Sequence, residues 1–465
     1  MHDHVARQRA RTRRFRSALL RRWKRLAPDA AGHDEPARAA ERSAAVGPTK
    51  PRLLKVIGPG LITGASDDDP SGIATYSQAG AEFGFSILWT MLLTYPLMWA
   101  VQEISARIGR TTGRGIAGNL RKHYPPAVAF AILPLLLIAN IINLGADLGA
   151  MADALSLLSG APRVLLVLVL GSVCVALQMG LRYTHYVSLL KWLTLSLFAY
   201  FATALLVDVS WQKALHGLVV PSFQADRTFW LTVVAVLGTT ISPYLFFWQA
   251  AQEVEDQKVS PKRAPLKHAP HQAPAALARI RLDTALGMGF SNLVALAIMV
   301  TTAATLHAQG LTDIQTSIDA AKALEPVVGH SAFAVFTLGI VGTGFLAIPV
   351  LGGSAAYALG ELRRWPVGLE RQPVEAKAFY AALTMATLLG AAVTLSPISP
   401  IDALFWSAVV NGVLAAPIMV LLMVMAATPK IMGEFVIAGP LRLVGWLATG
   451  VMILATLALA MAFVP

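Results

Sequence analysis

Three consecutive aspartates at positions 67–69 interrupt the first apolar stretch of this chain. One Asp at the centre of a membrane helix costs roughly 2.5–3.5 kcal/mol even on insertion-based scales. Pro70 removes a backbone donor and disfavours helix at the preceding residue, and Ser71-Gly72 adds flexibility and a competing hydroxyl. Because irregular backbone at membrane depth is tolerated only where it is buried or lines a cavity, we expect a broken helix that faces a cavity. The alternative is an extramembrane turn between two helices, each too short to span alone.

Composition supports a membrane setting for this break. Of the 465 residues, 55% are hydrophobic and only 14% are charged, against about 25% charged in soluble proteins. We therefore expect an all-α polytopic membrane protein with about eleven transmembrane helices. The predicted spans are 56–82 (broken at 67–72), 85–104, 127–152, 163–181, 189–209, 229–252, 283–306, 331–359, 378–396, 401–427 and 441–463.

Basic residues gather in the first 50 positions and in alternate loops, which gives the net charge of +12. This pattern follows the positive-inside rule, so we expect a cytoplasmic N-terminus in a bacterial-type inner (plasma) membrane, and no nucleic-acid partner. Residues 1–50 lack the apolar core of a signal peptide. Their basic composition predicts a disordered cytoplasmic tail. Segments 210–228 and 307–330 are predicted to be external loops, and 264–276 to be unstructured.

The sixth span contains a second break, at Gly238-Thr239-Thr240-Ile241-Ser242-Pro243-Tyr244. The two broken spans are five apart and start on opposite sides of the membrane. Interrupted helices in corresponding positions of two oppositely oriented halves indicate an inverted-repeat transporter. We expect a 5+5 arrangement like the amino-acid/sodium symporter fold: 51–209 as the first repeat, 210–427 as the second, and 428–465 carrying the eleventh span.

Oxygen atoms dominate the chemistry of the two breaks. They offer the carboxylate of Asp69, the hydroxyls of Thr239 and Ser242, and unwound carbonyls beside both prolines. Carboxylates and carbonyls without thiols or imidazoles suit a hard cation. A neutral substrate would not offset the cost of burying Asp69.

Several motifs resemble the NRAMP divalent-metal transporters. Gly58-Pro59-Gly60, Asp69-Pro70-Ser71-Gly72 and Gln78-Ala79-Gly80 are similar to the first helix of that family, and Ala146-Asp147-Leu148 to its third. Residues 238–244 resemble its sixth-helix motif. The resemblance covers about 50–430 in span order, and it implies eleven spans, an inverted repeat and alternating-access transport of divalent metal.

The departures from the family pattern concern its metal ligands. Gly72 stands where the family has a ligating Asn, Ser242 where it has Met, and Tyr244 where it has His. Losing the thioether removes a ligand that favours transition metals, and losing Asn opens volume. Such a site suits a partly hydrated Mg²⁺, which sheds water reluctantly. The pattern is similar to the NRAMP-related magnesium transporters, and Ala150 and Gln249 in place of Glu and His imply weak or absent proton coupling.

These arguments define two groups of candidate residues. The predicted metal-binding residues are Asp69, Gly72, Thr239 and Ser242, and the predicted cavity or ion-path residues are Asp67, Asp68, Ser71, Tyr244, Asp147, Asn143, Gln249 and Asn411. For Asp147 two interpretations stay open: an ion-path residue, or a buried anchor hydrogen-bonded to Asn143.

We predict a non-enzymatic transporter that imports Mg²⁺ and Mn²⁺, with no resident cofactor. Its partners would be the divalent ion and the lipid bilayer, and a monomer is compatible with the sequence. The main alternative is a proton-coupled Mn²⁺/Fe²⁺ symporter of the usual NRAMP type. A cation channel and an intramembrane aspartyl protease are weaker alternatives, because nothing indicates a symmetric filter or a protease motif.

Overall fold

The computed structural model describes residues 59–180, 197–224, 226–259, 263–394 and 399–463, and within these ranges all regular structure is helical. The predicted N-terminal tail lies outside them. The longer helices are α3 (Pro59–Asp67), α4 (Pro70–Phe83), α5 (Trp89–Thr112), α7 (Pro126–Ser159), α8 (Arg163–Gly180), α10 (Phe198–Leu206), α12 (Arg227–Thr240), α13 (Pro243–Val259), α14 (Ala273–Thr305), α17 (Ala332–Arg363), α18 (Lys377–Val393), α19 (Pro400–Ala426) and α21 (Gly439–Ala462).

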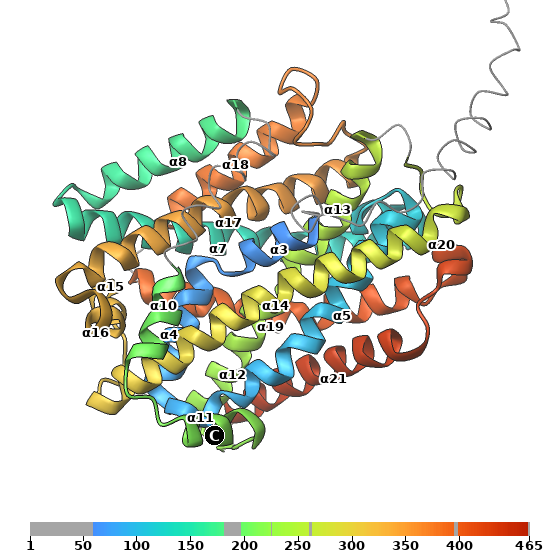
Figure 1. Cartoon of the computed structure of the whole chain (residues 1–465). Coiled ribbons are helices and arrows are strands. Elements are labelled where there is room, and N and C mark those ends of the chain that lie inside the picture. The colour runs from blue at the N-terminus through green and yellow to red at the C-terminus, as the bar shows by residue number, and fades with distance from the viewer. Residues whose placement is uncertain (1–58, 181–196, 225, 260–262, 395–398, 464–465) are drawn as a thin grey trace, which may run out of the picture. The chain divides into compact units, whose positions relative to one another are not determined.

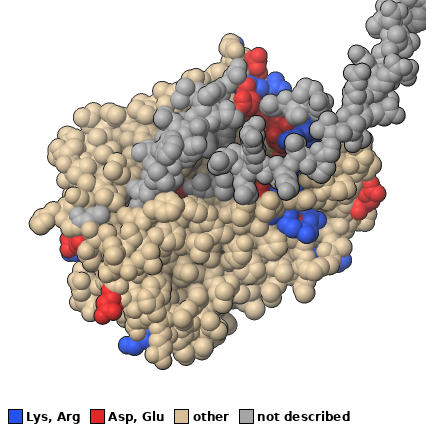
Figure 2. Space-filling model, viewed as in Figure 1, with Lys and Arg blue, Asp and Glu red and all other residues tan. Residues whose placement is uncertain are grey.

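The described helices match the predicted spans in order. Seven helical stretches are long and apolar enough to cross a membrane by length and composition, and α18 is a shorter apolar helix. The first part of the predicted fifth span, 189–196, lies outside the described residues, and α10 lies in its described part. The chain is therefore a multi-pass membrane protein. In Figure 2 the face outside the grey atoms is mostly uncharged, and charged side chains gather toward its ends.

Both predicted helix breaks are present. The first separates α3 from α4 at residues 68–69, and the second separates α12 from α13 at 241–242. Pro70 and Pro243 each open the second half-helix, where their missing N–H costs nothing. The two broken helices lie inside the bundle (Figure 1), where α14 packs on α3 and α4, and α19 packs on α12 and α4.

The basic loops meet at one end of the bundle. The backbone N–H of Leu266 donates to the Arg110 carbonyl at 3.2 Å, so the loop after α13 joins the end of α5. Arg121, in the short helix α6 (Ile116–His123), donates to the backbone carbonyl of Glu361 at the end of α17. Three of the loops that carry the positive charge are thus brought together, as the predicted topology requires.

Three segments predicted to be loops contain structure. Segment 210–228 holds α11 (Trp211–Val219), and 307–330 holds α15 (Ser317–Ala321) and α16 (Glu325–Val328). The expectation that 264–276 is unstructured is wrong. Its composition suggests disorder, but Arg110 donates to the Ala264 carbonyl at 3.0 Å and to the Gln272 amide oxygen at 2.8 Å. In addition, α14 begins at Ala273, ten residues before the predicted start of the seventh span.

Candidate functional site

Asp69 caps the helix that follows the first break. Its Oδ1 accepts hydrogen bonds from the Ser71 hydroxyl at 2.6 Å and from the Gly72 N–H at 2.8 Å. This is the usual way in which an Asp at the N-cap satisfies a free helix donor. Asp69, the predicted metal ligand, is therefore also the residue that caps α4 at the break. Its Oδ1 is used for this cap.

The second carboxylate oxygen of Asp69 faces away from its own helix. Oδ2 accepts hydrogen bonds from the Asn143 side-chain amide of α7 at 3.1 Å and from the Tyr244 hydroxyl of α13 at 3.2 Å. Asp69 is only 1% exposed. Both broken helices and the third predicted span thus converge on a single buried oxygen atom.

Gly72 and Thr239 bring the two breaks into contact. A Cβ built at Gly72 would lie 3.3 Å from the Thr239 Oγ1 and 3.3 Å from the Tyr76 ring, so this contact is already tight. The Ser242 hydroxyl makes local contacts: it donates to the Gly238 carbonyl at 2.7 Å and the Thr239 carbonyl at 2.9 Å. It therefore satisfies carbonyls freed at the end of α12, because Pro243 cannot do so.

Asp67 and Asp68 turn toward α14 and share one partner. The Ser291 hydroxyl lies 2.7 Å from Asp67 Oδ2 and 3.1 Å from Asp68 Oδ1, and their other oxygens have no hydrogen-bond partner among the described residues. The sequence analysis did not identify Ser291. The only sequence feature that marks it is a Ser-Asn pair in the apolar seventh span.

The remaining candidates occupy separate positions. The Asn143 amide binds Asp69, and neither oxygen of Asp147 has a hydrogen-bond partner among the described side chains, so the proposed Asp147–Asn143 bond is wrong. Gln249 accepts a hydrogen bond from Thr63 and thereby ties α13 to α3. Asn411 is buried on α19, and its amide nitrogen is unpaired within the described structure.

The side chains at this centre that could bind a cation carry carboxylate, hydroxyl and amide groups. Thr239, Ser242 and the three aspartates are each at most 2% exposed, so the centre is closed to solvent in this conformation. Among the described residues, no three His, Cys, Asp or Glu side chains are arranged to hold a metal ion together. A cation at Asp69 Oδ2 would meet this carboxylate and neutral oxygens, and water could contribute to its coordination.

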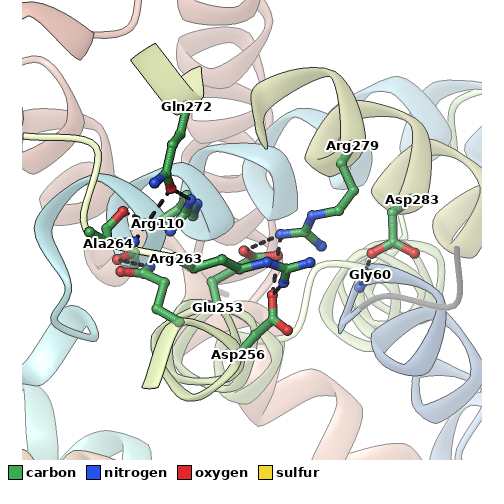
Figure 3. A network of polar contacts seen from close by, with 11 residues as sticks. Gly60, Arg110, Glu253, Asp256, Arg263, Ala264, Gln272, Arg279 and Asp283 are labelled. Carbon is green, nitrogen blue, oxygen red and sulfur yellow. Dashed lines mark hydrogen bonds and ion pairs between the residues drawn. The ribbon is translucent and has the colours of Figure 1, made fainter. Parts of the chain in front are cut away.

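A polar network closes the end of α3, as Figure 3 shows. The N–H of Gly60 donates to Asp283 Oδ2 of α14 at 2.7 Å. Arg279 of α14 pairs with Glu253 of α13 at 2.5 Å, and Asp256 pairs with Arg263. These contacts join α3, α13 and α14 at the end of the bundle where the basic loops meet.

Comparison with known proteins identifies the group to which this arrangement belongs. The sequence profile described as "Natural resistance-associated macrophage protein-like" (Nramp) matches residues 60–462. The chain belongs to the Nramp family. The chain is 28% identical over 412 residues to the divalent metal cation transporter MntH of Klebsiella pneumoniae (strain 342), covering 86% of this chain and 92% of that one.

Solved structures show the same fold. A manganese transporter of Eremococcus coleocola superimposes with a TM-score of 0.72 at 16% identity, over 90% of this chain and 88% of that one. MhsT in complex with L-phenylalanine gives 0.54 at 15% identity, over 87% of this chain and 97% of that one. The nucleobase-cation-symport-1 family transporter Mhp1, closed around bromovinylhydantoin, gives 0.52 at 14% identity, over 87% and 92%. The predicted inverted-repeat fold with broken first and sixth helices is therefore confirmed.

Proposed function

We propose that this Nramp protein imports divalent metal cations, with Mg²⁺ as its main substrate and Mn²⁺ as a second one. Asp69 carries the proposal, because its Oδ2 is a buried carboxylate oxygen held where the two broken helices meet. Burying a charged side chain inside the bundle at membrane depth costs free energy, and such residues are found where they serve an ion pathway. The relatives named as divalent metal and manganese transporters support the same class of substrate.

The preference for Mg²⁺ rests on the neighbours of Asp69. Its hydrogen-bond partners are a hydroxyl, an amide, a phenol and a backbone N–H, with no sulfur and no imidazole. A soft thioether is the ligand type that would select transition metals. Mg²⁺ usually binds through one or two carboxylates and keeps several of its waters, and Asp69 supplies a carboxylate of this kind.

Import needs no proton in this scheme. An inside-negative potential is worth about 2.3 kcal/mol per charge per 100 mV, or roughly 4.6 kcal/mol for a divalent ion. Ala150 and Gln249 lack the ionisable groups that would couple the ion to protons, and Gln249 instead binds Thr63. The N-terminus would be cytoplasmic, in a bacterial-type plasma membrane.

Alternating access would require the contacts at the end of α3 to separate. The bonds Gly60–Asp283 and Arg279–Glu253 hold α3, α13 and α14 together on the side of the basic loops. In the proposed orientation this side is cytoplasmic. Release of the ion would follow when α3 leaves α14, while the opposite side stays closed.

A proton-coupled Mn²⁺/Fe²⁺ symporter is the second candidate. It is favoured by the family of the chain and by the relatives whose names refer to divalent metal or manganese. It differs from the first proposal in two measurable respects. It would move protons with the metal, and it would discriminate against Mg²⁺.

Uptake into proteoliposomes at a fixed membrane potential tests both candidates. Mg²⁺, Mn²⁺ and Ca²⁺ would be followed together with internal pH. We expect saturable Mg²⁺ and Mn²⁺ uptake without acidification. Mn²⁺ uptake with acidification and without Mg²⁺ would establish the symporter instead, and non-saturating flux would indicate a channel.

A further inference from the structure

The short helix α11 has an exposed apolar face. Trp211, Leu215 and Val219 follow one another at helical spacing and are 50%, 60% and 65% exposed. On the opposite face, a Cβ at Gly217 would collide with the Phe85 carbonyl, so α11 is seated directly on the turn between α4 and α5. An exposed apolar stripe that contains a Trp, on a short helix that packs against a membrane protein, is typical of the lipid–water interface.

A cavity of about 830 Å³ lies behind α11. It falls in the range of roughly 300–1,000 Å³ typical of small-molecule sites. Its polar lining comes from α11 and the segment before it, from the short 3-10 helix η3 (Gly84–Ile87) and from the short 3-10 helix η6 (His307–Gln309) that follows α14. The polar lining residues are Ser86, Asp208, Ser210, Gln212, Lys213, His216 and His307.

Two opposite charges line this cavity without pairing. The side chains of Lys213 and Asp208 are exposed, and neither makes an ion pair or hydrogen bond with another described residue. His307 is held in place because its Nδ1 lies 2.8 Å from the Ala81 carbonyl. In the tautomer whose Nδ1–H donates to that carbonyl, Nε2 is an acceptor. The cavity thus offers a cationic donor and two acceptors.

We propose that this cavity binds the headgroup of a phospholipid that carries a phosphate and a primary ammonium, as in phosphatidylethanolamine. Lys213 donates to the phosphate, and Asp208 and the Nε2 of His307 accept N–H bonds from the ammonium. The acyl chains run along the exposed apolar side chains near the cavity, Leu205 and Leu206 at the end of α10 and the apolar face of α11. The polar headgroup then contacts the polar lining of the cavity, and the acyl chains contact apolar side chains.

The acceptors distinguish ethanolamine from other headgroups. A quaternary choline has no N–H to give, so Asp208 and His307 would lose their hydrogen bonds. Phosphatidylglycerol lacks the ammonium, so it would place its negative charge beside the unpaired Asp208. Hydrogen bonds to charged groups contribute about 1.5–3 kcal/mol, so the ethanolamine lipid should bind about tenfold or more tightly than either.

The test is lipid binding by the delipidated full-length protein, followed by native mass spectrometry. Phosphatidylethanolamine, its N-methylated and N,N-dimethylated forms, phosphatidylcholine and phosphatidylglycerol would be compared with matched acyl chains. We expect affinity to fall as N–H donors are removed, by about tenfold across the series. This series needs no variant, so it remains decisive even if a substitution prevents folding.

Variants test the two charges separately. Lys213→Gln and Asp208→Asn should each weaken binding of the ethanolamine lipid by about tenfold, and Asp208→Asn should also abolish its advantage over phosphatidylcholine. Lys377→Gln and Asp313→Asn, which remove exposed charges elsewhere, should change nothing. Equal affinity for all headgroups would overturn the proposal. Displacement of the lipid by millimolar inorganic phosphate would assign the cavity to free phosphate instead.

Discussion

The Tyr244 hydroxyl donates a hydrogen bond to Asp69 Oδ2 at 3.2 Å, and this contact joins the second halves of the two broken helices. Asn143 donates to the same oxygen at 3.1 Å. A cation that binds Oδ2 directly competes with both donors. A hydrated ion can leave part of this arrangement in place, because its waters accept and donate in turn.

Removing the charge of Asp69 should abolish transport and spare the fold. Asp69→Asn keeps an oxygen that can accept from Ser71 and from the Gly72 N–H, so the helix cap survives. We expect metal uptake by proteoliposomes to fall to background, with thermal unfolding within a few degrees of the wild type. Asp313→Asn, at an exposed position, is the matched control. Full uptake by Asp69→Asn would refute the proposed site.

Filling the space at Gly72 should affect Mg²⁺ more than Mn²⁺. An Ala Cβ would lie 3.3 Å from Thr239 Oγ1 and 3.3 Å from the Tyr76 ring, so it would crowd the contact between the two breaks beside Asp69 and leave less room for a hydrated ion. Because Mg²⁺ sheds water more reluctantly, we expect about a tenfold loss of Mg²⁺ uptake and a smaller loss for Mn²⁺. Parallel uptake curves measure the ratio. Gly171→Ala, where a Cβ meets nothing within 4 Å, is the control, and equal losses would contradict a hydrated ion.

Weakening the end of α3 should open the centre toward the basic loops. Asp283→Ala removes the acceptor of the Gly60 N–H, a charge-assisted bond worth about 1.5–3 kcal/mol. The open population should rise about tenfold or more. Thiol labelling of Thr284→Cys, which lies beneath Gly60, in a Cys174→Ser background reports this opening. Asp313→Ala is the control, and an unchanged labelling rate would show that Asp283 does not hold α3.

Glu361 should be a major stabilising residue at the same end. Its Oε1 and Oε2 accept from the N–H groups of Gly115 and Gly118 at 2.7 and 2.8 Å, which fixes the start of α6. Glu361→Ala should lower the free energy of unfolding by about 3 kcal/mol, because the two buried N–H donors lose their partner. Chemical unfolding in detergent measures this loss. Glu361→Gln should recover part of it, and the exposed Glu434→Ala should have no effect.

Much of the fold could be predicted because its causes are local. Pro70 and Pro243 break their helices wherever these pack, and consecutive aspartates cannot continue a lipid-facing helix. The short helix α11 was missed because Lys213 and His216 make its segment appear to be a polar loop. Its apolar spacing is present in the sequence, but which face is buried depends on Phe85, far away in the chain.

The sequence by itself determined where the first and sixth helices break and that Asp69 lies at one break, because proline geometry and the cost of charge in lipid act on the chain locally. Only the tertiary structure decided the partners of the aspartates. Ser291 donates a hydrogen bond to Asp67, 224 residues away in the chain. The Asn143 amide donates to Asp69 and not to Asp147, and the Ser242 hydroxyl donates to a carbonyl of α12. These choices follow from how separate helices pack, since each buried polar atom takes the partner that packing places within reach.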